Sequence, residues 1–451
     1  MSETPPKRDS GLAQEPGHGA ANSARLRHWR MRVFAGTWLS YAGYYFGRKP
    51  FYQVKGTLQG KLSIPTKSLS HVGTAYLAAY SVGQFNAAAI GTRLGPRRMI
   101  LAGMAISMLC NVVAGIVPGF WPLLFVMSLN GLAQATGWPG NVGTMAHWTR
   151  REERGTIMGF WSTCYQVGGL LAGLTASYLL GLYGWKASFF GGAATLLLVI
   201  VLFSVLQRNR PEDVGLSPLD DEQEDDEQQD DEQEDTEGAP HSKSDRAHKG
   251  WDRNVRITLL LMGGTYFSIK FVRYLLLSWA AFFLQIHFNL RKDHAGYVAN
   301  IFDLTGTAGT ITAGIVSDRV FHGRRTPVIL IMLAGMTLST LLLWQLGSSS
   351  VTIFTISLGL IGFMIYGPDS LLSAAGAIDV GRSGGAIAAA GIINGIGATG
   401  SVLQEEIVGA LYTGPQDDLG PLFAIIFAAA IASLVGVTLL AIRAHRGTSR
   451  L

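Results

Sequence analysis

The chain has 451 residues, of which 48% are hydrophobic and 15% are charged, with 56 glycines and a positive mean hydropathy. Soluble domains carry charge on about a quarter of their residues, so this composition excludes an ordinary soluble protein and indicates a membrane protein with several spans. The formal net charge is +5, but residues 212–237 hold 15 of the 31 acidic residues and no Lys or Arg, so the remainder is strongly basic.

Twelve apolar stretches follow one another along the chain, each near the ~20 residues with which a helix crosses ~30 Å of hydrocarbon. We expect spans at residues 33–52, 69–91, 99–117, 120–145, 155–182, 187–206, 256–285, 296–316, 327–346, 351–375, 384–412 and 421–442. The predicted fold class is an all-α membrane protein with two pseudo-symmetric six-helix bundles, residues 33–206 and 251–443.

The segments outside these bundles are polar. Residues 1–32 and 444–451 are predicted to be cytoplasmic tails, with residues 1–24 disordered because they are rich in Pro, Gly and Ser. Residues 207–250 carry Asp-Asp-Glu-Gln repeats and are predicted to be a disordered cytoplasmic linker, either a solvated spacer or a regulatory, partner-binding segment. Arginine clusters at both ends and after the second and fourth spans place both termini inside by the positive-inside rule, although Lys55, Lys61 and Lys67 fall in the predicted outer loop.

The first predicted span contains two adjacent cations, Arg48 and Lys49. A charge at membrane depth normally faces a bundle interior or an aqueous cavity, where it pairs or binds a ligand. Tyr41, Tyr45 and Arg48 have the spacing i, i+4, i+7 and therefore share one helix face. Lys49 points about 100° away from that face. We interpret Arg48 as part of an anion site.

The same pattern returns 225 residues later as Tyr266, Lys270 and Arg273. Two six-span repeats with a binding site near the membrane midplane are the architecture that such an internal repeat indicates.

Two sets of motifs resemble a known family. The segment 314–325, with Asp318, Arg319 and Arg324, resembles the gating loop motif of the major facilitator superfamily, whereas the copy in the first half has Thr92 in place of the acid. The segments 41–49, 130–139, 145–148, 153–155, 167–169, 273–279 and 362–368 resemble the organophosphate:phosphate antiporter family, which includes bacterial glycerol-3-phosphate and hexose-phosphate carriers and a hexose-phosphate sensor.

This resemblance implies that Arg48 and Arg273 bind a phosphoryl group and that Tyr41, Tyr45 and Tyr80 line the cavity. Guanidinium groups suit this role chemically, since they hold tetrahedral oxyanions in a two-pronged manner and stay charged. The chain departs from the family at two positions, with Gln84 where several members have Lys and Tyr165 where the bacterial carriers have His. Lys270 could supply the missing positive charge.

Other interpretations of these residues stay open. The cations could instead pair with intramembrane acids, namely Asp303, Asp369, Glu405 or Glu406. Lys49 could pack or pair, and Lys270 could contact ligand or pair with Asp303 or Asp369. Asp369 could carry a proton or neutralise a cation, and Glu405 and Glu406 are predicted to be interfacial. Trp138 is a packing wedge or a ligand contact, Asn394 joins helices or lines the cavity, and Trp161 is ambiguous.

The predicted function is a secondary transporter in a bacterial-type inner membrane that exchanges a phosphorylated organic anion for inorganic phosphate by alternating access. The alternatives are a proton-coupled anion symporter and a transporter-like sugar-phosphate receptor. The sequence has no hydrolase, zinc-protease or nucleotide-binding motif, and Cys110 and Cys164 lie in apolar segments. We therefore expect no enzyme activity, cofactor, metal or nucleic-acid partner, and a monomer.

Overall fold

The structure is a computed structural model that describes residues 16–117, 119–219, 253–321 and 325–446. The helices of the first half are α1 (Pro16–Phe46), α2 (Lys49–Leu62), α3 (Thr66–Leu94), α4 (Pro96–Ile116), α5 (Phe120–Gln134), α6 (Gly137–Trp148), α7 (Arg151–Tyr183) and α8 (Trp185–Leu206), followed by the short 3₁₀ helix η1 (Pro211–Val214). Those of the second half are α10 (Arg253–Ile286), α11 (Lys292–Ala299), α12 (Ile301–Arg319), α13 (Arg325–Leu346), α14 (Val351–Ser370), the π-helical turn η3 (Leu371–Gly376), α15 (Ala377–Leu411) and α16 (Gly420–His445).

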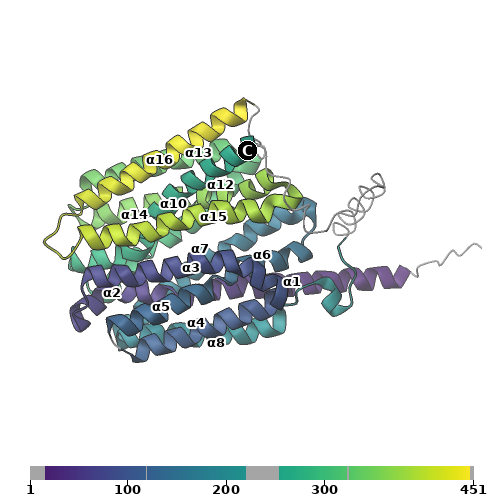
Figure 1. Ribbon diagram of the computed structural model, residues 1–451, viewed down its shortest axis with the longest axis horizontal. Helices are drawn as coiled ribbons and strands as arrows, with labels where there is room; N and C mark the ends of the chain where they lie inside the picture. The colour runs from purple at the N-terminus through teal and green to yellow at the C-terminus, as the bar shows by residue number, and fades with distance from the viewer. Residues whose placement is uncertain (1–15, 118, 220–252, 322–324, 447–451) are drawn as a thin grey trace, which may run out of the picture.

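The long helices run roughly side by side in two groups, one from each half of the sequence (Figure 1). The start of α1 and the end of α16 lie at the same end of this bundle, which we call the terminal end. The connection between α2 and α3 lies at the opposite end, which we call the distal end. Each half buries its own apolar faces, and the halves meet where α3 packs on α15, α2 on α10, and α7 on α11 and α12.

The expected all-α fold with twelve spans is confirmed, but three of the spans are divided. The pairs α1–α2, α5–α6 and α11–α12 each cover one predicted span. Among the described helices, those that are singly long and apolar enough to cross a membrane are α4, α8, α10, α13, α14 and α16.

The first span differs most from its prediction. Helix α1 begins at Pro16, so residues 16–24 are helical where a disordered tail was predicted, and the earlier part of that tail lies outside the described residues. The helix ends at Phe46, and a new helix starts with Pro50 in its first turn, where a missing backbone N–H has no consequence. Gly47 at this break lies so close to α4 that a Cβ atom would stand 2.6 Å from Oγ of Ser107. The break turns Arg48 and Lys49 into junction residues between α1 and α2.

The first part of the predicted disordered linker is ordered, since residues 207–219 contain η1 and the buried side chains of Pro211, Leu216 and Leu219. The rest, residues 220–250, lies outside the described residues, so its role and the exact domain boundaries stay predictions.

Candidate substrate site

A cavity of about 320 Å³ lies between the two halves. Helices α1, α3, α6 and α7 supply one wall, and α10, α14, η3 and α15 supply the other. The lining residues are Tyr41, Tyr45, Tyr80, Ser81, Gln84, Trp138, Tyr165, Tyr266, Lys270, Arg273, Tyr274, Asp369, Ser373, Ile392, Asn394, Gly395 and Ala398. The volume is within the range of about 300–1,000 Å³ that is usual for small-molecule sites.

The residues predicted for substrate contact therefore gather at one place. Nine of the eleven line this cavity: Tyr41, Tyr45, Tyr80, Gln84, Trp138, Tyr165, Lys270, Arg273 and Asn394. The other two, Arg48 and Lys49, are buried outside the lining.

Arg48 lies directly behind the tyrosines of the first wall. Its guanidinium carbon is 4.8 Å from the ring centroid of Tyr45 and 5.1 Å from that of Tyr80. Its Nε donates a hydrogen bond of 3.1 Å to Oε1 of Gln134. The predicted alternative, an ion pair with an intramembrane acid, is not made by Arg48 with any described residue. Arg48 is 2% exposed, so a ligand reaches it only when the aromatic wall moves.

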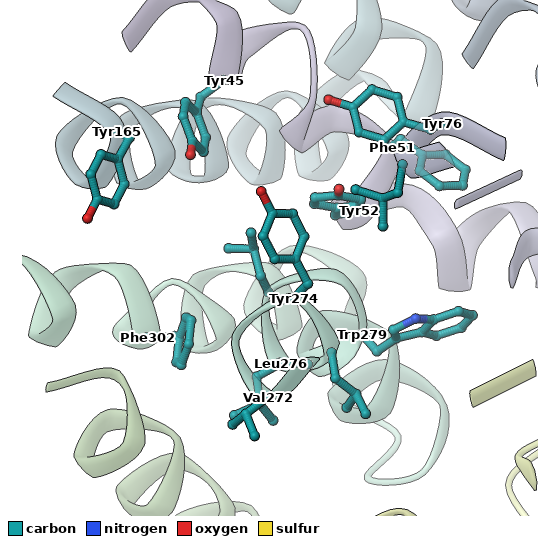
Figure 2. Packing of buried hydrophobic residues seen from close by; sticks show 14 of the residues in the cluster. Tyr45, Phe51, Tyr52, Tyr76, Tyr165, Val272, Tyr274, Leu276, Trp279 and Phe302 are labelled. Atoms are coloured by element: carbon teal, nitrogen blue, oxygen red, sulfur yellow. The ribbon is translucent and has the colours of Figure 1, made fainter. Parts of the chain in front are cut away.

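Arg273 is the counterpart of Arg48 in the second half, and it does pair with an acid. Its Nη1 lies 2.8 Å from Oδ2 of Asp369, and its guanidinium stacks on the rings of Tyr165 and Tyr366. The hydroxyl of Tyr165 also donates to Oδ2 of Asp369, at 3.2 Å. Figure 2 shows Tyr165 and Tyr45 in the first half opposite Tyr274, whose hydroxyl points across the junction of the halves. The residue pair Arg273–Asp369 thus stands inside a mostly aromatic enclosure.

The two lysines predicted for the site, Lys49 and Lys270, have different kinds of partner. Lys49 forms an ion pair with Asp303, which also accepts a hydrogen bond from Tyr366. Lys270 pairs with neither of the acids proposed for it; its Nζ donates to Oδ1 of Asn394 at 3.3 Å and lies 4.8 Å from the ring centroid of Tyr266. Lys49 therefore joins the halves, whereas Lys270 keeps its ammonium group at the cavity.

Two tryptophans complete the aromatic wall of the first half. Trp138 packs against Tyr41 and Trp161, with ring centroids 5.1 Å and 5.4 Å away. Trp161 is fully buried and donates to Oγ1 of Thr37, so it supports Trp138 from behind.

The predicted gating motif is only partly described. Arg319 ends α12 and is exposed, Arg324 lies outside the described residues, and so does the side chain of Asp318.

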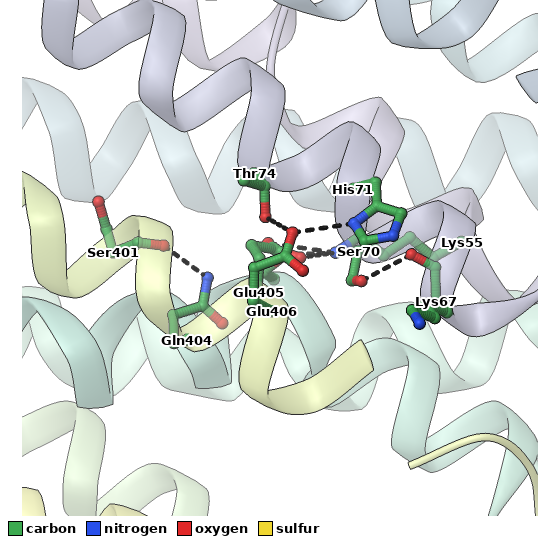
Figure 3. Close-up of polar contacts among 10 residues, drawn as sticks. Lys55, Lys67, Ser70, His71, Thr74, Ser401, Gln404, Glu405 and Glu406 are labelled. Atoms are coloured by element: carbon green, nitrogen blue, oxygen red, sulfur yellow. Dashed lines mark hydrogen bonds and ion pairs between the residues drawn. The ribbon is translucent and has the colours of Figure 1, made fainter. Parts of the chain in front are cut away.

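A third buried charge pair, Lys55–Glu405, was not predicted from the sequence. Lys55 and Glu405 are both 0% exposed, and Nζ of Lys55 lies 3.0 Å from Oε2 of Glu405. The ammonium group also donates to Ser278 and stands 3.6 Å from the centroid of Trp279 (Figure 3 shows Lys55 and Glu405). The predicted placement of Lys55 in an outer loop was wrong because α2 continues to Leu62, and the predicted interfacial position of Glu405 was wrong because α2 and α3 cover it. Only Glu406, half-exposed beside His71, lies near the surface.

The charges around the cavity do not cancel. Lys49 is balanced by Asp303 and Lys55 by Glu405, both outside the lining. Arg48, Lys270 and Arg273 remain, with Asp369 as the one acid beside them among the described side chains, which leaves a net charge of +2. The arrangement suits a small dianion with an apolar or hydroxylated body, because tyrosine and tryptophan make up half of the remaining lining residues.

Comparisons with known proteins agree with this architecture. The family model described as Major Facilitator Superfamily matches residues 36–402. The chain is similar to the glycerol-3-phosphate transporter of Bacillus subtilis, with 28% identity over 86% of this chain and 87% of that protein. It is also similar to the membrane sensor protein UhpC of Salmonella typhimurium, with 27% identity over 78% of this chain and 79% of that protein.

Among solved structures, a bacterial homologue of the human lysosomal transporter Spinster matches with a TM-score of 0.65. The identity is 15%, and the match covers 92% of this chain and 95% of that chain. This similarity supports the fold alone.

Proposed function

Since the chain belongs to the Major Facilitator Superfamily, we propose that it is a secondary transporter that exchanges a phosphorylated organic anion for inorganic phosphate by alternating access. It is an integral, multi-pass membrane protein, and the resemblance to the organophosphate:phosphate antiporter family is confirmed by its curated relatives. Membership of this family also confirms the expectation that it is not an enzyme. The proposed organic substrate is a sugar phosphate or a glycerol phosphate.

The net charge of +2 at the cavity carries this proposal. A phosphate monoester bears about −1.5 to −2 charges at neutral pH, so it neutralises the site almost completely. The two arginines come from opposite halves, Arg48 from the α1–α2 junction and Arg273 from α10. A ligand that contacts both would draw the halves together around itself.

Obligatory exchange follows from the same charges. Buried cations without a counter-ion are costly, so an empty cavity resists the closure that precedes reorientation. A bound phosphate or phosphate ester removes most of that cost, and it can be replaced by another such anion on either side. The cycle needs only the difference in affinity between the states and no ATP.

The test is phosphate counterflow in reconstituted liposomes. Vesicles loaded with phosphate are offered labelled phosphate, glycerol-3-phosphate or glucose-6-phosphate. Arg48→Lys and Arg273→Lys should each remove most of the exchange although the charge is kept, because an ammonium group lacks the planar fork. Arg27→Lys, at an exposed position of α1, serves as the matched control and should retain wild-type exchange. Near-normal exchange in both site variants, at equal membrane abundance, would refute the proposal.

A receptor function is the second candidate, because the chain is also similar to a membrane sensor protein. A receptor would bind phosphate esters without catalysing counterflow, whereas an exchanger does both. The third possibility, proton-coupled symport, predicts uptake driven by a pH gradient into vesicles that contain no phosphate. The same liposomes therefore separate all three functions.

A further inference from the structure

Two residues of the cavity lining keep a buried polar atom without a partner among the described residues. These atoms are Nε of Arg273, which is a donor, and Oδ1 of Asp369, which is an acceptor. The other buried, unpartnered side-chain atoms belong to described residues that do not line the cavity. Buried polar groups are nearly always paired, and an unpaired charged group is costly. The paired residues Arg273 and Asp369 thus still require one acceptor and one donor.

Only one oxygen of the Asp369 carboxylate accepts hydrogen bonds from described residues. Both hydrogen bonds that Asp369 accepts from described side chains, those of Arg273 and Tyr165, end on Oδ2. An ionised carboxylate has about four acceptor sites, so Oδ1 retains its capacity. Asp369 also follows Pro368 and lies two residues before the π-helical turn η3, an irregularity that is frequent at functional sites.

Asp303 provides an internal comparison. It too is a buried carboxylate of the second half that holds one cation and one tyrosine. Its partners are divided, with Lys49 on Oδ2 and Tyr366 on Oδ1, and it does not line the cavity. Both oxygens of Asp303 therefore have a partner in the protein, whereas Oδ1 of Asp369 has none among the described residues.

We propose that Oδ1 of Asp369 accepts hydrogen bonds from hydroxyl groups of the substrate's organic part, while Nε of Arg273 donates to its phosphoryl group. This inference rests on the proposed function and assigns to Asp369 the selection of phosphate esters that carry a hydroxyl close to the phosphate. Esters without such a hydroxyl leave Oδ1 unpaired in the bound state, and a site built to bind a hydroxyl discriminates strongly against its absence. Esters that carry a carboxylate in addition to the phosphate are repelled by Asp369.

In a competing arrangement, Oδ1 would accept a hydrogen bond from a protonated oxygen of the phosphoryl group itself. In that case Asp369 would act equally on every phosphate monoester. The two arrangements are separated by a pair of ligands that share the phosphoryl group and the three-carbon chain, glycerol-3-phosphate with two hydroxyls and propyl phosphate with none.

The experiment measures how each of the two esters inhibits labelled-phosphate counterflow in liposomes that contain the full chain. In the wild type, propyl phosphate should need at least a tenfold higher concentration than glycerol-3-phosphate for half-inhibition. The ratio of the two half-inhibitory concentrations, propyl phosphate over glycerol-3-phosphate, should fall at least threefold in Asp369→Asn, because a neutral amide oxygen is a weaker acceptor. In Asp369→Ala it should approach one. Asp303→Asn is the matched control, and its ratio should equal that of the wild type whatever its exchange rate.

The two proposals fail in different ways. No counterflow of labelled phosphate in the wild type would overturn the proposed function. Counterflow with equal inhibition by both esters, or a wild-type ratio retained in both Asp369 variants, would overturn the role of Asp369 alone. If a variant shows no counterflow, its melting temperature is measured in detergent at increasing concentrations of each ester. Ligand binding stabilises the folded state, so these shifts give the ratio of the two affinities instead.

Discussion

Lys270 is the one lysine whose ammonium group stays at the cavity among the described residues, and this position gives it a testable role. Its partner is the neutral amide of Asn394, so its charge is available to an anion. We expect Lys270→Gln to raise the half-saturating concentration for phosphate esters at least tenfold, which corresponds to about 1.4 kcal/mol of binding free energy. Counterflow at a series of ester concentrations measures the change.

Two double variants test whether Lys270 instead balances an acid. If it compensated Asp369, removing the lysine alone would leave a buried charge, and Lys270→Gln/Asp369→Asn would restore the affinity. Such a rescue would contradict direct binding. Lys270→Gln/Asp303→Asn is the control, because Asp303 already has Lys49 as its partner, and no rescue is expected from it.

At the scale of residues, the sequence predicted which side chains line the cavity far better than it predicted the contacts among them. Tyr41, Tyr45 and Lys270 were found because helical spacing and the internal repeat place them on one face. The pairing of Lys49 with Asp303 could not be predicted, since it joins residues 254 positions apart and depends on how the halves dock. Tyr274, which lines the cavity beside Arg273, was passed over although it stands in the quoted motif.

At the scale of elements, α2 holds the halves together at the distal end. Lys55 of α2 is buried against Ser278 of α10 and Glu405 of α15, and His71 of α3 contacts Glu406 at 3.0 Å (Figure 3). The first pair is fully buried, whereas the second is about 40% exposed. Removal of one partner of a buried pair leaves an uncompensated charge, but an exposed pair contributes little.

We therefore expect Glu405→Gln to destabilise the described conformation by about 3–5 kcal/mol, and Lys55→Met/Glu405→Gln to recover most of that loss. Thermal unfolding in detergent, with both single variants and the double variant, gives the coupling energy between the two residues. His71→Ala is the matched control for the exposed pair, with an expected cost of about 0–1 kcal/mol. If the effects of Lys55→Met and Glu405→Gln on the free energy of unfolding are additive, the coupling energy between the two residues is zero and the prediction is contradicted.

The helix breaks show why this network was missed. The sequence Arg48-Lys49-Pro50 contains a proline that begins a helix, and this signal could have indicated a junction at residue 48. Without it, the first span was predicted to end near residue 52, and Lys55 was assigned to a loop. The burial of Glu405 had no local signal, because it depends on Gly73 of α3, which allows the close approach of that carboxylate.

At the scale of the whole molecule, many polar contacts between the halves lie at the distal end. The pairs Lys55–Glu405 and His71–Glu406 lie there, together with a hydrogen bond of 3.1 Å from Thr66 to the carbonyl oxygen of Thr413. The cavity lining extends along α3 as far as Gln84, toward the terminal end. In an alternating-access carrier one end closes while the other admits substrate. We infer that the described state is closed at the distal end.

This state predicts from which side a thiol reagent reaches the cavity. The native cysteines, Cys110 and Cys164, are both buried and can be replaced by serine to give a silent background. In this background, Ser81→Cys places a thiol on α3 in the cavity lining, and Gly60→Cys places one on exposed surface near the distal end of α2.

A membrane-impermeant maleimide should label Ser81→Cys in inside-out vesicles and Gly60→Cys in right-side-out vesicles, since the termini are predicted to be cytoplasmic. Added phosphate should let the carrier visit the opposite state, and Ser81→Cys should then also react in right-side-out vesicles. Labelling of Ser81→Cys in right-side-out vesicles without phosphate would contradict the closed distal end, and its absence after phosphate is added would contradict the exchange cycle.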